Sequence, residues 1–339
     1  MTLKKILLTV TVLIAAGMIL TACAGPAGPQ GPAGPQGPAG PQGPAGAAPA
    51  ASELTCTQCH NDTSLITGVD HAWSGSVHAT GMATSYAGGR ATCAGCHGSQ
   101  GFAERMAAGQ TNPDDFTNTY ANPASIDCRA CHQIHTTYTK DDFALRTTAA
   151  VPLYAFTGVT YDGGMGNLCA NCHQPRRAFP AATDGMVKVD STHWGPHHGP
   201  QSAVLLGVGG ALGVEGAPAA HYSMVKDTCE ACHMGGDAAS HTYVPNVATC
   251  KACHADAKNF DIDGVQTAVA AKLDTLKGEL QKAGLLDDKG GIVVGTYPEK
   301  QAGALWNYIL VSKEDKSEGV HNAKYINALL DASLAVFGK

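Results

Sequence analysis

One five-residue pattern, Cys-x-x-Cys-His, occurs six times between residues 56 and 254. Two thiols at this spacing can add to the two vinyl groups of a porphyrin, and the histidine that follows is then carried beneath the iron. The pattern therefore predicts six haem c groups. The cysteines expected to form thioether bonds are Cys56, Cys59, Cys93, Cys96, Cys128, Cys131, Cys169, Cys172, Cys229, Cys232, Cys250 and Cys253. The proximal histidines are His60, His97, His132, His173, His233 and His254.

Paired cysteines also serve as disulfides in exported proteins and as zinc ligands. Neither use requires a histidine directly after every pair. The haem interpretation also explains the composition, since aromatic residues make up only 6% of the chain and glycine reaches 41 of 339 residues. Side chains alone would build a thin core, whereas large apolar macrocycles can supply the missing buried area.

Each iron needs a second axial ligand if it is only to carry electrons, and nine of the fifteen histidines lie outside the motifs. Bis-histidine ligation predicts low-spin iron and low reduction potentials, because thioether ligation is what raises them. The distal candidates are His78, His135, His198, His221, His241 and His321. Met106 and Met234 are alternatives, but we expect both to fill gaps in the core.

The spacing supports these candidates unequally. His135 comes three residues after the histidine of the third motif, so one helical turn would direct it toward a neighbouring haem. His71 and His78 lie between the first two motifs, where we expect at least one ligand. His197 and His198 are adjacent, and we favour His198.

Four stretches resemble a known group of proteins. They are HWGPHHGPQ (193–201), HYSMVKDTCEACHM (221–234), SHTYVPNVATCKACH (240–254) and EGVHNAKYINALL (318–330). They resemble blocks of multihaem cytochromes c related to the pentahaem nitrite reductases and octahaem hydroxylamine oxidoreductases, and the likeness runs from about Cys56 to the end. It implies distal roles for His221, His241 and His321. The CxxCK motif of the nitrite reductases is absent, so no catalytic residue is carried over.

The first residues are typical of an exported lipoprotein. Lys4 and Lys5 precede an apolar run over 6–20, which ends in Leu-Thr-Ala before Cys23. This run is shorter than the ~20 residues that span a bilayer, so residues 1–22 are predicted to be a signal peptide. The site resembles a lipobox, which implies lipidation of Cys23, and the following alanine favours the outer membrane. The net charge of −6 argues against nucleic acid as a partner.

Residues 23–51 are predicted to form a spacer behind the lipid anchor. Glycine recurs at every third position from Gly25 to Gly46, with proline after each one but the last. This collagen-like pattern cannot form a packed core. A single polyproline II strand is favoured over a trimeric stalk, and at ~3.1 Å per residue it would extend about 65 to 70 Å.

The remaining chain is expected to be mainly α-helical with extensive loops, organised around stacked haems. Residues 52–260 hold all six motifs and many turn-forming residues, and are assigned to a six-haem domain. Residues 261–339 are assigned to a helical segment packed on it. Apolar residues at helical spacing predict one helix from Val265 through Leu280 and two more over 302–311 and 323–336.

Three functions remain open. The first is electron transfer in anaerobic respiration, from a quinol-oxidising cytochrome or other multihaem cytochromes to a periplasmic or extracellular acceptor. The second is an enzyme that reduces a small nitrogen or sulfur compound at one haem with an open coordination position. The third is a subunit of a haem filament or conduit. We favour the first, because it needs no catalytic side chain.

Overall fold

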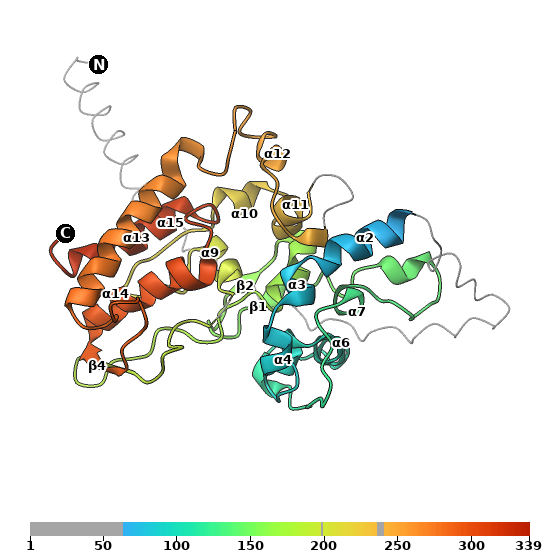
Figure 1. The fold of residues 1–339 in the computed structure, drawn as a ribbon, viewed down its shortest axis with the longest axis horizontal. Helices are drawn as coiled ribbons and strands as arrows, with labels where there is room; N and C mark the ends of the chain where they lie inside the picture. The colour runs from blue at the N-terminus through green and yellow to red at the C-terminus, as the bar shows by residue number, and fades with distance from the viewer. Residues whose placement is uncertain (1–63, 198, 236–240) are drawn as a thin grey trace, which may run out of the picture. The chain divides into compact units, whose positions relative to one another are not determined.

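The computed structural model describes residues 64–197, 199–235 and 241–339 (Figure 1). The chain divides into two units, Met1–Ala47 and Ala48–Lys339, and every described residue belongs to the second. The predicted signal peptide, Cys23, the spacer, the first motif (Cys56, Cys59 and His60) and His198 lie outside the described residues. These assignments stay predictions.

The fold is mainly helical with long connecting loops, as expected. The short α-helices are α2 (Ser64–Ser74), α3 (Val77–Thr80), α4 (Ala83–Ala87), α5 (Ala94–His97), α6 (Ser99–Ala107), α7 (Cys128–Cys131), α8 (Asn167–Ala170), α9 (Gln201–Leu206), α10 (Ala220–Met224), α11 (Cys229–His233) and α12 (Val247–Cys250). Single 3-10 turns are η3 (Pro113–Asp115), η4 (Lys140–Phe143), η5 (Gly164–Gly166) and η7 (Ile262–Gly264). The longer helices are α13 (Val265–Lys282), α14 (Glu299–Ile309) and α15 (Ala323–Ala335).

Strands within the described ranges form two short antiparallel pairs. Strand β1 (Val151–Pro152) pairs with β2 (Thr160–Tyr161), and β3 (Met186–Val189) pairs with β4 (Gly295–Pro298). In β3 the side chains of Val187 and Val189 are buried and their neighbours are exposed, which is the alternation expected when one face of a strand is covered. The β3–β4 pair therefore ties the loop after the fourth motif to the C-terminal helices.

The last 75 residues contain the main side-chain core. Helices α13, α14 and α15 pack against one another, side by side in Figure 1. The side chains at their contact have no exposed surface: Val269, Leu276, Leu280, Leu305, Trp306, Ile326, Leu329 and Leu330, each at 0%. Their spacing places them on one face of each helix. The sequence-based prediction of three helices here is confirmed.

The second of these helices, α14, ends at a different residue from the one predicted. Helix α14 stops at Ile309 and continues as a π-helical turn, η8 (Leu310–Asp315). Lys316, Glu318 and Gly319 then all take positive φ values, of 60°, 50° and 99°. The apolar pattern could not show this change, because a single π-helical turn is too short to produce an apolar period of its own.

The loop after η8 is anchored by a buried amide. Asn322 precedes α15, and its Nδ2 donates to the carbonyl oxygens of Val204 and Ala217, both at 3.0 Å. Its Oδ1 accepts from the backbone N of Tyr325 at 3.2 Å, which caps the helix. The position of the neighbouring His321 is thereby fixed against helix α9.

The part of the chain before α13 has little core of its own. Apart from Val187, Val189, Trp194, Val204 and Ala211, which join the main core, its buried apolar residues include two small clusters, one around Leu153 and Tyr161 and another around Phe102 and Leu168. None of the helices in the described ranges combines the length and apolar character needed to cross a bilayer.

Candidate haem-binding sites

Each of the five described motifs forms one helical turn. The histidine N–H donates to the carbonyl oxygen of the first cysteine at 3.0 Å in His97–Cys93, 2.8 Å in His132–Cys128, 2.9 Å in His173–Cys169 and 2.8 Å in His254–Cys250. The fifth motif lies wholly within α11. A helical turn places the first cysteine and the histidine on the same side. At the third motif, Asp127 caps the turn by accepting from the backbone N of Arg129 at 2.9 Å.

Every described motif histidine faces a second histidine from another part of the chain. The distances between ring centroids are 6.2 Å for His97–His197, 6.2 Å for His173–His78, 6.3 Å for His132–His241, 6.3 Å for His233–His321 and 6.3 Å for His254–His221. The angles between ring planes, in contrast, range from 31° to 89°. A constant separation with a varying tilt is not what direct ring packing would produce.

This separation fits an iron between the two rings. Two metal–nitrogen bonds of about 2.0 Å, with about 1.15 Å from each nitrogen to its ring centroid, place the centroids about 6.3 Å apart. Each imidazole can rotate about the line that joins the two nitrogens through the metal, which accounts for the range of interplanar angles. The described residues therefore fit bis-histidine haems at five motifs.

The structure brings together some of the predicted distal candidates. His78, His221, His241 and His321 each lie opposite a motif histidine. At the second motif the opposing ring is that of His197, the neighbour of the favoured His198. The remaining candidate, His135, stacks on Tyr138 with centroids 5.5 Å apart. The five described motif histidines face other rings, so His135 is opposite none of them.

The second ring nitrogen of these histidines has a defined partner at several sites. The Nδ1–oxygen distances are 2.6 Å for His132 to Phe143 O, 2.9 Å for His233 to Tyr243 O, 2.8 Å for His221 to Val320 O, 3.3 Å for His173 to Gln201 Oε1 and 2.7 Å for His321 to Asp315 Oδ1. A carbonyl oxygen can only accept, so Nδ1 carries the proton and Nε2 keeps its lone pair. Metal-binding histidines are oriented in this way.

Burial also sets the protonation of one distal candidate. Burial and, to a smaller extent, the nearby charge of His173 together lower the pKa of His78 to about 4. Its Nδ1 finds no hydrogen-bond partner among the described residues. The ring is therefore neutral at neutral pH, which is the form that binds a metal.

Tyr243 contacts ligands of three sites. Its ring lies edge-on to His78 with centroids 4.5 Å apart, and 6.2 Å from that of His241. Its carbonyl oxygen accepts from His233. The residue has a φ of 59°, which is rare for an aromatic side chain and turns this carbonyl toward the ring. Tyr243 thus contacts one candidate ligand of each of the third, fourth and fifth sites.

Cysteines of different motifs are neighbours. Cys96 lies within hydrogen-bond reach of Cys172, and Cys169 lies within reach of Cys229. These contacts join the second, fourth and fifth candidate sites into one cluster.

A buried cation lies beside this cluster. Arg105 has no exposed surface, and its Nη2 donates to the carbonyl oxygen of Asn171 at 2.9 Å. Its Nε and Nη1 have no partner among the described residues. Burying a guanidinium whose nitrogens lack acceptors costs free energy. A haem propionate is an anion that could accept hydrogen bonds from these nitrogens. Arg105 could not be recognised from the sequence as a partner for a propionate, because a single arginine on a short helix usually faces solvent.

Other residues of the sites also escaped the sequence analysis. Asp315 and Tyr243 carry no motif, and only their contacts with ring nitrogens reveal them. His197 was considered but not chosen. It has a φ of 73° and lies between Gly195 and Gly199, which also take positive φ values, and its ring faces that of His97.

Comparison with known proteins supports the fold. No family model matches the chain, and no curated protein matches it. Among solved structures, the outer cell wall cytochrome OcwA is similar, with a TM-score of 0.53 and 21% sequence identity. The match covers 78% of this chain and 49% of that one, so the chain spans about half the length of OcwA. The chain thus has a multihaem cytochrome fold.

Proposed function

We propose that this chain is an electron-transfer cytochrome that holds haem c at all six motifs. The observation that supports it is the set of five histidine pairs with one common ring separation, 6.2 to 6.3 Å. Bound haem would supply a one-electron ferric–ferrous couple. The chain would hold each iron between two imidazoles in both oxidation states, which keeps the structural change on electron transfer small.

The ligand assignment follows from the pairs. We assign His97 and His197 to the second site, His132 and His241 to the third, His173 and His78 to the fourth, His233 and His321 to the fifth, and His254 and His221 to the sixth. For the first site we assign His60 with His135, because the other motif histidines already have opposing rings.

Electron transfer is favoured over catalysis by the same pairs. A haem that reduces a small molecule needs an open axial position, and at the five described motifs both positions have an imidazole in place. No lysine replaces a motif histidine in the sequence. An open position would therefore have to belong to the first motif.

The setting is also a proposal. We propose that the chain is exported, lipidated at Cys23 and held to the outer membrane by its collagen-like spacer. It would exchange electrons with a quinol-oxidising cytochrome or other multihaem cytochromes, during anaerobic respiration toward a periplasmic or extracellular acceptor. The printed name of OcwA places that protein in the outer cell wall, which agrees with an exported location here.

The experiment is electron paramagnetic resonance of the purified, oxidised protein, combined with a pyridine haemochrome assay. We expect six haems per chain and low-spin ferric iron throughout. Mass spectrometry should show no free thiol among the motif cysteines. A haem count below six would contradict the cofactor assignment. A full count with one high-spin iron would instead favour the enzyme.

A further inference from the structure

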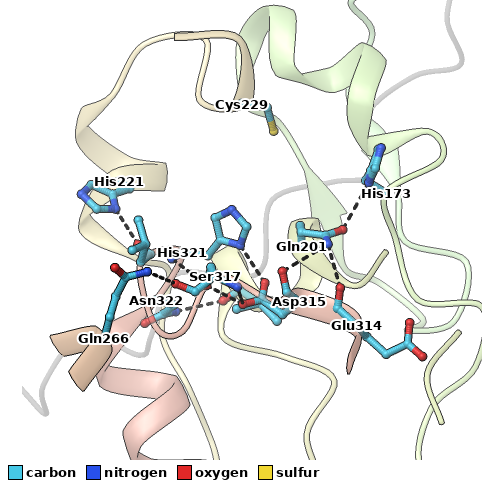
Figure 2. A network of polar contacts seen from close by, with 12 residues as sticks. His173, Gln201, His221, Cys229, Gln266, Glu314, Asp315, Ser317, His321 and Asn322 are labelled. Atoms are coloured by element: carbon cyan, nitrogen blue, oxygen red, sulfur yellow. Dashed lines mark hydrogen bonds and ion pairs between the residues drawn. The ribbon is translucent and has the colours of Figure 1, made fainter. Parts of the chain in front are cut away.

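The segment from η8 to Asn322 supports ligands of three sites (Figure 2). Gln201 faces His173 through Oε1, and its Nε2 donates to the carbonyl oxygen of Glu314 at 3.0 Å. The carbonyl oxygen of Val320 accepts from His221. His321 belongs to the segment itself. The positive φ values after η8 allow this short stretch to turn toward all three ligands.

Asp315 differs from the other partners of these rings. Of the five Nδ1 contacts described above, four end on neutral carbonyl or amide oxygens and one ends on a carboxylate. Oδ1 of Asp315 lies 2.7 Å from Nδ1 of His321, and the aspartate side chain is 0% exposed. A carboxylate at this position strengthens the basicity of a metal-bound imidazole more than a carbonyl does.

The second carboxylate oxygen is fixed by Ser317. Its Oγ donates to Oδ2 of Asp315 at 2.5 Å and its backbone N donates at 3.2 Å. The backbone N of His321 in turn donates to Ser317 Oγ at 3.2 Å. The strained loop between Asp315 and His321 thus holds the carboxylate and the imidazole in fixed relative positions, with Oδ1 directed at Nδ1.

The Asp315 carboxylate acts directly on the ring through this hydrogen bond, with both groups held away from solvent. A strong hydrogen bond from Nδ1 to a carboxylate gives the imidazole partial imidazolate character. Such a ring donates more charge to ferric iron and stabilises the oxidised state.

We propose that Asp315 is a positioning residue that lowers the reduction potential of the site between His233 and His321. The inference rests on the proposed function, since it concerns one of the assigned sites. In the half-reaction the iron gains one electron from an external reductant, no bond is broken, and the Nδ1 proton stays between His321 and Asp315.

The test is the Asp315→Asn variant of the full chain, titrated with dithionite while optical and paramagnetic resonance spectra are recorded. We expect one of the six low-spin signals to change its g values. The iron that gives it should be about tenfold easier to reduce, which corresponds to about 59 mV for one electron. The other five signals should keep their g values and potentials.

Three further variants make the result specific. Asp331→Asn removes the same charge from an exposed ion pair with Lys272, and should change no potential. Asp315→Glu keeps a carboxylate and should shift the potential less than Asp315→Asn. Ser317→Ala removes the Oγ hydrogen bond to the carboxylate and keeps the backbone one. It should shift the same signal in the same direction by a smaller amount, and it remains informative if Asp315→Asn does not fold.

The inference is overturned if Asp315→Asn or, where that variant does not fold, Ser317→Ala leaves every potential and g value unchanged. It is also overturned if all six signals shift together, because that would indicate a general structural change. Failure of the proposed function would look different, since the wild-type protein would then lack six low-spin haems.

Discussion

His197 offers the sharpest test of the ligand assignment, because its neighbour His198 was the choice from sequence. The structure places the ring of His197 6.2 Å from that of His97, at an interplanar angle of 89°. Truncation to alanine removes the imidazole and leaves no side-chain nitrogen at this position. The His197→Ala variant should therefore lose the distal ligand of the second site and keep the thioether bonds of Cys93 and Cys96.

The size of the effect follows from the number of sites. With six haems, one in six should become high-spin, or about one sixth of the total ferric iron. The backbone gives a second expectation, since His197 has a φ of 73°. Glycine adopts this conformation without strain, so His197→Gly should remove about 1 kcal/mol of local strain while losing the same ligand. A high-spin signal in His197→Gly could then not be ascribed to a disturbed turn.

The assay is quantitative paramagnetic resonance of the oxidised variants, before and after addition of free imidazole. His197→Ala and His197→Gly should both show the high-spin fraction, and added imidazole should return it to low-spin. His198→Ala is the matched control and should stay low-spin throughout. A low-spin spectrum for His197→Ala, or a high-spin fraction in His198→Ala alone, would refute the reasoning.

Three other variants test the surrounding structure. Tyr243→Ala removes the ring between His78 and His241; we expect changed g values for two low-spin signals and an unchanged haem count, and a wild-type spectrum would contradict the contact. Leu330→Ala opens a cavity in a core position with 0% exposure, which should lower the free energy of unfolding by about 2 to 5 kcal/mol, measured by denaturant titration of haem-loaded protein. Asp127→Ala removes the cap of α7, at a cost of about 1 kcal/mol. Burial raises the pKa of Asp127, but hydrogen bonds from Arg129 and Ser99 outweigh it and lower the pKa. Its stabilisation is therefore present above the unfolded-state pKa and lost in acid, so the melting temperatures of wild type and variant should converge as the pH falls; a constant difference would show that the carboxylate is not responsible.

The sequence predicted those parts of the fold whose interacting residues lie close together along the chain. Helix α13 was expected because Val269, Leu276 and Leu280 share one face, and all three are buried. The Cys-x-x-Cys-His spacing is local too, and each described motif forms one helical turn. In both cases the residues that interact lie within a few turns of one another.

The distal partners depend on interactions across the chain, and spacing could not choose them. His135 was expected to reach a haem other than that of the third motif, which agrees with the pairing of His132 with His241, but spacing could not say which haem that is. His197 and His198 are adjacent, so spacing could not choose between them, and the structure places the ring of His197 opposite that of His97. The Asp315 contact depends on a π-helical turn, which has no signature in an apolar pattern.

The pairing of His233 with His321 also has a consequence for biogenesis. With iron bound, each pair would act as a cross-link that closes a long loop, comparable in its effect on the unfolded chain to a disulfide. The loop between His233 and His321 could not close before His321 had been translocated. Helices α13 to α15 have an apolar core of their own and could form early, whereas the preceding segments would depend on cofactor insertion for their final shape. Maturation and folding of this protein should therefore be a single coupled process.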